Sequence, residues 1–159
     1  MSDRAAPQPD RIYCADALAE LQRFTIESVD LIVTSPPYLD SVDYMYNAML
    51  EYFWLGPMLG VNSRQAFNQM RRKTIGAKNP RKKSQQIPEI INDLLVPSEV
   101  NPARLPAIVD YCQQMQLHFE EASRVLKNGG HYVLVIGNSQ TANGILPVHD
   151  ALIRFAANS

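Results

Sequence analysis

The chain has 159 residues, of which 46% are hydrophobic and 19% charged, which is typical of one globular domain with a hydrophobic core. The first ten residues have no apolar core and no apolar run reaches membrane-spanning length, so we expect neither a signal peptide nor a membrane anchor. Cys14 and Cys112 lack metal-ligand spacing and predict reduced, buried thiols and no metal site. These properties favour a soluble, cytoplasmic protein.

The positive charge is concentrated in one segment, although the net charge is only −1. No acidic residue lies between Glu51 and Glu89, and that interval holds eight of the fifteen lysines and arginines, all within residues 64–83. We call residues 64–83 the basic segment. Its local field suits a polyanion, but a solvated surface loop is an equally good interpretation of such a run. The candidate DNA contacts in it are Arg71, Arg72, Lys73, Lys82 and Lys83.

In chain order, residues 1–10 predict a disordered lead-in, followed by a short apolar run at 11–14. Leu18, Leu21 and Phe24 share one side of a helix predicted over 17–24, with Asp16 near its N-terminal end. Residues 29–34, VDLIVT, predict a parallel strand buried on both faces. That strand ends at two prolines, which cannot donate into a sheet ladder.

The middle of the chain predicts helices at about 43–55 and 62–73, followed by a loop at 76–88. Apolar residues at a spacing of three to four predict the longest helix over 102–127, with Asn128-Gly129-Gly130 as its C-terminal stop. Residues 131–136, HYVLVI, predict a second buried strand, and a further helix begins near Val148.

This alternation of strands and helices predicts an α/β fold with a parallel sheet and helices on both faces. Ligands of such sheets bind beyond the carboxyl ends of the strands. Asp16, residues 35–38 and Asn138 are expected at such ends, so the sequence predicts that they share one site. Asn138 would hydrogen-bond the substrate or cap the following turn, and the sequence leaves both roles open.

Residues 35–38, Ser-Pro-Pro-Tyr, carry the most specific chemistry, and we call them the SPPY loop. Pro36 and Pro37 have no N–H, so this loop presents carbonyl oxygens together with the Ser35 hydroxyl as hydrogen-bond acceptors. Such acceptors activate the amino group of a nucleobase, and Tyr38 offers a flat face for a base flipped out of the duplex. A plain strand end is the alternative role, but the position directly after a buried strand and before several aromatic residues favours the site.

Residues 28–38, SVDLIVTSPPY, resemble the strand and catalytic loop of the DNA amino-methyltransferases that modify cytosine N4 or adenine N6. Residues 11–16, RIYCAD, are similar to the segment that precedes this loop in the same family. Supporting similarity lies in residues 43–44, 51–56, 71–76 and 129–139. The resemblance therefore spans about residues 11–155.

The resemblance implies a partial Rossmann-like class I methyltransferase fold that uses S-adenosyl-L-methionine (SAM). The substrate it implies is double-stranded DNA with a flipped target base. The residues it assigns to the base are Ser35, Pro36, Pro37 and Tyr38, and those it assigns to the cofactor are Asp16 and Thr34. Because the Ser form of the loop is more often associated with cytosine enzymes, cytosine N4 is favoured over adenine N6. Tyr44 would line the base pocket or simply pack its helix on the sheet.

Two parts of the family pattern are missing: a glycine-rich cofactor loop and an acidic residue on the following strand. Without the corresponding strands, the sheet would have a central gap that leaves apolar faces uncovered. We therefore expect residues 11–159 to be the catalytic half of a methyltransferase domain, with a basic insert at about 60–100. A circularly permuted order, with the cofactor half after residue 159, is the simplest explanation, and loss of that half or its supply by a separate chain are the alternatives.

Two other functions compete with DNA base methylation. An RNA or protein-amide methyltransferase uses similar loop geometry, but those relatives more often carry Asn or Asp at the position of Ser35. A non-catalytic remnant that binds nucleic acid through residues 71–83 is favoured by the missing glycine loop. The target sequence and any restriction partner cannot be read from these residues.

Overall fold

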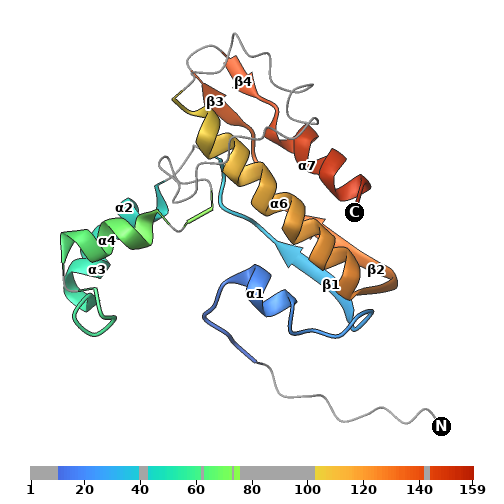
Figure 1. Cartoon of the computed structure of the whole chain (residues 1–159), viewed down its shortest axis with the longest axis horizontal. Coiled ribbons are helices and arrows are strands. Elements are labelled where there is room, and N and C mark those ends of the chain that lie inside the picture. The colour runs from blue at the N-terminus through green and yellow to red at the C-terminus, as the bar shows by residue number, and fades with distance from the viewer. Residues whose placement is uncertain (1–10, 40–42, 62, 73, 76–102, 142–143) are drawn as a thin grey trace.

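The computed structural model describes residues 11–39, 43–61, 63–72, 74–75, 103–141 and 144–159. The expected lead-in and most of the basic segment, including Lys73, Lys82 and Lys83, lie outside these ranges. The described part is mixed α/β, with one two-stranded parallel sheet, one two-stranded antiparallel sheet and several helices (Figure 1).

The parallel sheet consists of β1 (Val29–Thr34) and β2 (Leu126–Leu134), as the sequence predicted for its two apolar runs. Ile32, Val33 and Thr34 are in register with Tyr132, Val133 and Leu134. The pairing continues past the strand ends, because the Val135 amide donates to the Thr34 carbonyl at 2.9 Å. At the other end, Lys127 Nζ lies 2.7 Å from Asp30 Oδ1. The two strands therefore end together, and the segments that follow them begin side by side.

Helix α6 (Leu105–Val125) and helix α7 (Val148–Ala157) pack against each other and form the main core. The buried positions of α6 recur every three to four residues, which places them on one stripe of the helix. Tyr111, Met115, Leu152 and Phe155 are among the largest fully buried side chains. Burying each such side chain contributes roughly 1.5–3 kcal/mol, so this helix pair is the main stabilising unit of the described fold.

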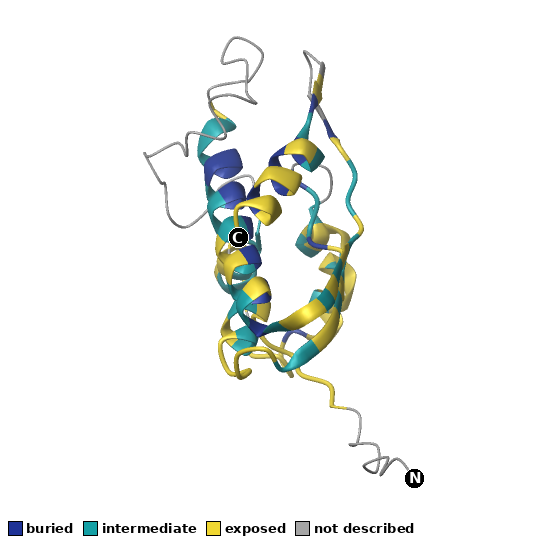
Figure 2. Cartoon of the chain, turned by 90° about the vertical axis from the view of Figure 1, so that its right-hand side faces the viewer, coloured by how far each residue is buried: buried dark blue, intermediate teal, exposed yellow. Residues whose placement is uncertain are grey.

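Within the described part of the chain, only one face of the parallel sheet is covered. Tyr132, Leu134 and Ile136 pack on the core, whereas Leu31 and Val33 on the opposite face are 53% and 63% exposed. Exposed positions along the strands are yellow in Figure 2. The prediction that residues 29–34 are buried on both faces is therefore wrong. An apolar strand composition predicts two covering layers, and the described residues provide only one.

Three short helices lie to one side of the sheet and core (Figure 1): α2 (Tyr44–Asn47), α3 (Met49–Leu55) and α4 (Arg64–Arg71). The single helix predicted over 43–55 is interrupted at Ala48, whose φ of −89° and ψ of 18° are not helical. The polar helix predicted over 62–73 is confirmed as α4, which Ser63 caps through its hydroxyl. Gly56 ends α3 where no larger residue fits, because a Cβ there would lie 2.3 Å from the Tyr52 carbonyl oxygen.

Several element boundaries differ from the sequence prediction. Residues 11–14 form no strand, and α1 (Ala17–Leu21) is shorter than predicted. Helix α6 ends at Val125 instead of near residue 127, and β2 begins at once, so Asn128-Gly129-Gly130 lie within the strand. An antiparallel hairpin of β3 (Ser139–Thr141) and β4 (Gly144–Leu146) follows and was not predicted. None of the helices in the described ranges has the length and apolarity that crossing a membrane requires.

Candidate functional site

The SPPY loop continues directly from β1 and forms neither helix nor strand. Pro36 is buried, Pro37 and Tyr38 are half-buried, and Ser35 is exposed at the strand end. The proline rings fix φ and bias the preceding residue towards extended backbone, which explains why the chain leaves the sheet without turning into a helix. The buried proline anchors the loop while the Ser35 hydroxyl stays open to a ligand.

The segment after β2, residues 135–138, runs beside the SPPY loop, and we call it the β2 loop. A Cβ placed on Gly137 would lie 3.5 Å from Cε2 of Tyr38, so the tyrosine ring lies over the glycine. One residue beyond each loop, the buried Ser139 hydroxyl donates to the Leu39 carbonyl oxygen. The two strand ends are thus joined by ring packing and by a buried hydrogen bond, which fixes the position of Tyr38.

Tyr44 on α2 also reaches the SPPY loop. The backbone N–H of Tyr38 donates to the Tyr44 hydroxyl oxygen at 3.3 Å, and the Tyr44 side chain remains 41% exposed. The structure therefore brings this predicted residue to the loop instead of packing it on the sheet. Its hydroxyl satisfies the only backbone donor in the stretch Pro36-Pro37-Tyr38, because the two prolines have none.

Arg71 is engaged within the protein. Its Nε lies 2.6 Å from Asp43 Oδ2, its terminal nitrogen contacts the same oxygen, and its guanidinium lies 5.8 Å from the ring centre of Tyr46. The other oxygen of Asp43 accepts the Tyr46 amide at 3.0 Å and caps α2. Arg72 is exposed next to it. Arg71 therefore fastens α4 to α2, the helix that carries Tyr44, while Arg72 is open to solvent.

Asn138 in the β2 loop has a partner that the sequence did not predict. Its Oδ1 is hydrogen-bonded to Nδ1 of His149, near the start of α7, and Nε2 of His149 lies 3.1 Å from Asp150 Oδ1. The intervening β3–β4 hairpin returns the chain so that residues eleven positions apart meet. The sequence could not predict this contact, because it depends on the path of the β3–β4 hairpin and not on a periodic pattern of residues.

Asp16 occupies a different place from the one predicted. Its Oδ1 accepts the Ala19 amide at 3.0 Å, which makes it the N-cap of α1. Arg124, just before β2 begins, donates to the Leu21 and Phe24 carbonyl oxygens at 3.0 Å each and ties the end of α1 to that end of the sheet. The expectation that Asp16 lies at a strand's carboxyl end is wrong, because residues 11–14 pair with no strand and Asp is a favoured helix cap.

The two expected SAM contacts are consequently not brought together. Thr34 is the last residue of β1, whereas α1 is tied to the sheet where the strands start. The described residues thus contain the SPPY loop but do not bring Asp16 and Thr34 together. Among these residues there is also no cluster of three or more His, Cys, Asp or Glu that would hold a metal ion.

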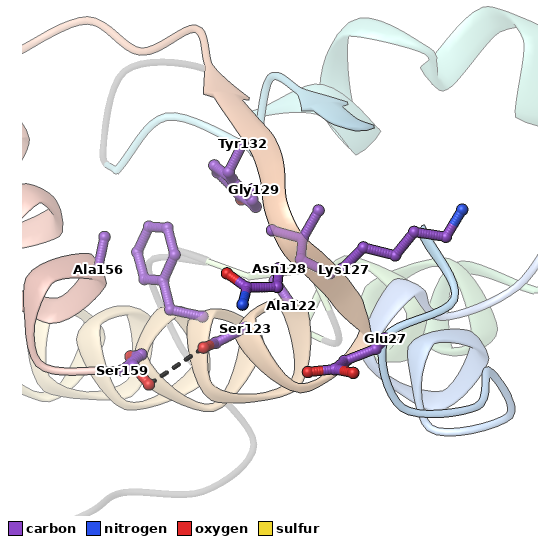
Figure 3. Close-up of a pocket in the computed structure, with 11 residues that line it drawn as sticks. Glu27, Ala122, Ser123, Lys127, Asn128, Gly129, Tyr132, Ala156 and Ser159 are labelled. Carbon is purple, nitrogen blue, oxygen red and sulfur yellow. Dashed lines mark hydrogen bonds between the residues drawn. The ribbon is translucent and has the colours of Figure 1, made fainter. Parts of the chain in front are cut away.

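A pocket of about 480 Å³ lies beside the first half of β2 (Figure 3). Its lining comes from the ends of α6 and α7 and from strand residues that include Asn128 and Gly129, and the Ser123 hydroxyl donates to the Ser159 carbonyl at 3.1 Å. Tyr132 closes one side of it. None of the residues predicted for the site lines this pocket.

Two groups near the site have shifted pKa values. Burial, and after it the electrostatic effect of Cys112 and neighbouring tyrosines that include Tyr44 and Tyr38, raises the pKa of Tyr111. Burial raises the pKa of the Cys112 thiol to about 12. Both groups therefore stay neutral at physiological pH and serve as packing beneath the loop, not as acids or bases.

The geometry thus joins the SPPY loop, Tyr44 and the β2 loop at one end of the parallel sheet. Asp16 lies away from this end of the sheet. Lys73, Lys82 and Lys83 lie outside the described residues. Comparison with protein-family models, with curated proteins and with solved structures found no match to this chain.

Proposed function

We propose that this chain carries the base-binding half of a SAM-dependent DNA methyltransferase with a partial Rossmann-like class I fold. The reaction is transfer of a methyl group to the exocyclic amine of a flipped base, with cytosine N4 favoured over adenine N6. One observation carries the proposal: the SPPY loop leaves the carboxyl end of a parallel strand with Ser35 exposed and Tyr38 held between Gly137 and Tyr44.

The acceptors of this loop suit an amino group that is a poor nucleophile. The lone pair of a base amino nitrogen is delocalised into the ring, and hydrogen bonds from its two N–H groups to fixed acceptors favour a tetrahedral nitrogen. Ser35 Oγ and the carbonyl oxygens of the proline pair are such acceptors, and fixed acceptors of this kind stabilise the positive charge that develops on the nitrogen. The methylated nitrogen is acidic and releases its proton to water, so no strong base is required at the loop.

Tyr38 supplies the stacking surface. One part of its ring lies on Gly137, and its backbone is fixed through the Tyr44 hydroxyl. An unstacked base gains roughly 1–3 kcal/mol from an aromatic face, and a ring held in advance loses little freedom when the base arrives. The packing of Tyr38 is therefore part of the base site.

DNA contact is the role that we propose for the basic segment. Arg72 is exposed on the same group of helices that carries Tyr44, and Arg71 lies beside it. Contacts of lysine and arginine to phosphates position the duplex and make affinity depend on salt. SAM supplies the methyl group when it is bound, and we propose that residues beyond the described ranges, or a separate chain, hold it.

A nucleic-acid-binding protein without catalysis is the second candidate. It is favoured by the separation of Asp16 from Thr34, which leaves no assembled cofactor contacts among the described residues. Isothermal titration of SAM into the purified chain tests this second candidate, which predicts no binding. Tight binding would show that this chain holds the cofactor unaided and would refute the second candidate, whereas without binding any methylation requires that another segment or chain supply that half.

The reaction itself is tested in a bacterial strain that lacks amino-methylated DNA bases. The chain is expressed together with its neighbouring reading frames, and the DNA is digested to nucleosides and analysed by mass spectrometry. We expect N4-methyldeoxycytidine, and we expect Ser35→Ala to abolish it without lowering the melting temperature. Absence of any methylated amino base with the unaltered chain, or its persistence with Ser35→Ala, would refute the proposed function.

A further inference from the structure

The contact between Asn138 and His149 lies beside the SPPY loop and determines which end of the Asn138 side-chain amide is free to bind a ligand. Oδ1 of Asn138 is occupied by Nδ1 of His149, so the amide nitrogen is the end that remains for another partner. Within the part of the chain that the structure describes, Asn138 is exposed and its amide nitrogen forms no other hydrogen bond. Because an amide oxygen only accepts, Nδ1 carries the hydrogen in this contact, and the ion pair of Nε2 with Asp150 Oδ1 at 3.1 Å forms in addition when the ring is protonated.

The β2 loop carries this amide to the same strand ends as Ser35. Thr34 is in register with Leu134 and bonded to Val135, and Gly137, next to Asn138, lies under the Tyr38 ring. A base stacked on Tyr38 would therefore have two kinds of groups at the same strand ends. The SPPY loop offers acceptors, and the amide nitrogen of Asn138 offers a donor.

This order of groups matches one class of base edge. Cytosine and adenine present an amino group next to an unprotonated ring nitrogen, which is a donor beside an acceptor. Thymine, uracil and guanine present a carbonyl next to a ring N–H, which is the reverse. An acceptor at Ser35 and a donor at Asn138 pair with the amino group and the ring nitrogen of cytosine or adenine. With thymine, uracil or guanine, an acceptor would face the carbonyl oxygen and a donor would face the ring N–H.

We propose that Asn138, oriented by His149, donates from its amide nitrogen to the ring nitrogen of the flipped base and thereby selects amino bases over keto bases. This inference rests on the proposed function, because it assigns a role within the same site. Asn138 is the specificity residue that touches the base. His149 is a positioning residue that acts through Asn138.

The matched probes are short single-stranded oligonucleotides, oligo-dC and oligo-dU, which differ only in the exchange of the amino group for a carbonyl and of the ring nitrogen for N–H. Affinity is measured by fluorescence anisotropy on the full chain. With two positions mismatched, we expect oligo-dC to bind about 25-fold more tightly than oligo-dU, because one hydrogen bond to a neutral group is worth about fivefold.

Asn138→Ala and Asn138→Asp both remove the donor, and each is expected to reduce the dC/dU ratio to about fivefold or less. Asn138→Asp also tests the orientation of the amide, because a carboxylate can only accept. An unchanged ratio in this variant would mean that Asn138 presents oxygen to the base, and it would overturn the inference.

His149→Phe removes the ring nitrogen that holds Asn138 and is expected to lower the ratio as Asn138→Ala does. His149→Asn keeps a polar nitrogen near the position of Nδ1 and is expected to restore most of it. His131→Phe is the control, since His131 is an exposed histidine on β2 outside this contact. Loss of the ratio in His131→Phe, or no loss in His149→Phe, would overturn the positioning role.

The outcomes separate this inference from the proposed function. Equal binding of oligo-dC and oligo-dU by the unaltered chain refutes base recognition at the SPPY loop altogether. A preference for oligo-dC that Ser35→Ala removes but that survives Asn138→Ala and His149→Phe leaves the proposed function intact and refutes the inference alone. Melting temperatures of all variants show whether a lost preference comes from unfolding.

Discussion

Arg71 of α4 forms an ion pair with Asp43, the residue that caps α2. One carboxylate therefore both starts the helix that carries Tyr44 and neutralises the first arginine of a candidate DNA-binding surface. DNA phosphates would compete with Asp43 for Arg71. On the proposed function, the ion pair would lower DNA affinity in addition to linking the two helices.

Asp43→Asn keeps the helix cap, because Asn caps as well as Asp, but it removes the negative charge beside Arg71. We expect it to tighten binding of a mixed-sequence duplex at low salt by roughly two- to threefold, a modest gain typical of a freed surface charge. Arg71→Ala should weaken binding and reduce the slope of log affinity against log salt by about 1. Anisotropy titrations over a range of salt concentrations measure both, and weaker binding by Asp43→Asn would contradict the competition.

The contact between Tyr38 and Gly137 gives a graded prediction. Alanine at 137 fits, because its Cβ would lie 3.5 Å from the ring, at ordinary contact distance. Valine adds two methyl groups towards the ring and would displace Tyr38. We expect Gly137→Ala to bind oligo-dC normally and Gly137→Val to lose at least about fivefold, which is the lower range of base stacking.

Tyr38→Phe and Tyr38→Ala serve as the matched controls for this prediction. The first keeps the ring and should bind normally, and the second should lose as much affinity as Gly137→Val. The double variant Tyr38→Ala with Gly137→Val should lose no more than either single change, because both act on the same ring. Additive losses would show that Gly137 acts independently of Tyr38.

His118 makes the stability depend on pH. Its Nε2 is hydrogen-bonded to the Tyr132 hydroxyl at 2.8 Å, and burial lowers its pKa below the ordinary value of 6.5. The unfolded chain therefore takes up a proton at a higher pH than the folded chain, and stability falls as the pH drops through about 6.5 towards the folded pKa. Thermal melts should show a smaller drop over this range for His118→Gln than for the unaltered protein, and an equal drop would refute the assignment.

The two cysteines are expected to differ in reactivity. Cys14 is exposed, which corrects the prediction of a buried thiol, whereas Cys112 is buried in the core as predicted and has its pKa raised to about 12. Because the thiolate is the reactive form, an aromatic disulfide reagent should modify Cys14 rapidly and Cys112 only after unfolding. Mass spectrometry of the labelled chain identifies the site, and fast labelling of Cys112 in the folded protein would contradict this core.

The sequence predicted best those elements whose own pattern matches their burial. Helices α6 and α7 each bury a stripe of residues with a helical period. Strand β1 and the second half of β2 are short apolar runs that pair with each other. Such patterns are local, so the sequence reveals them without any knowledge of the partner. The place of the SPPY loop at the end of β1 followed for the same reason.

The sequence failed where a distant contact decides the structure. Residues 11–14 are apolar like a strand, but without a neighbouring strand they remain irregular, and Asp16 becomes a cap. The β3–β4 hairpin is too short to show a period, so the meeting of Asn138 with His149 could not be predicted. The interruption at Ala48 likewise could not be predicted, because alanine is itself the best helix former.

The parallel pairing of β1 with β2 also determines when the site forms. Asp30 bonds to Lys127 across 97 positions, and Leu39 accepts from Ser139 across 100. Contacts this distant in sequence form late and slowly, after local helices. During synthesis the SPPY loop precedes its supports at Gly137 and His149 by about a hundred residues. The nascent loop therefore lacks the contacts that fix Tyr38 and Asn138 until that later segment has been made.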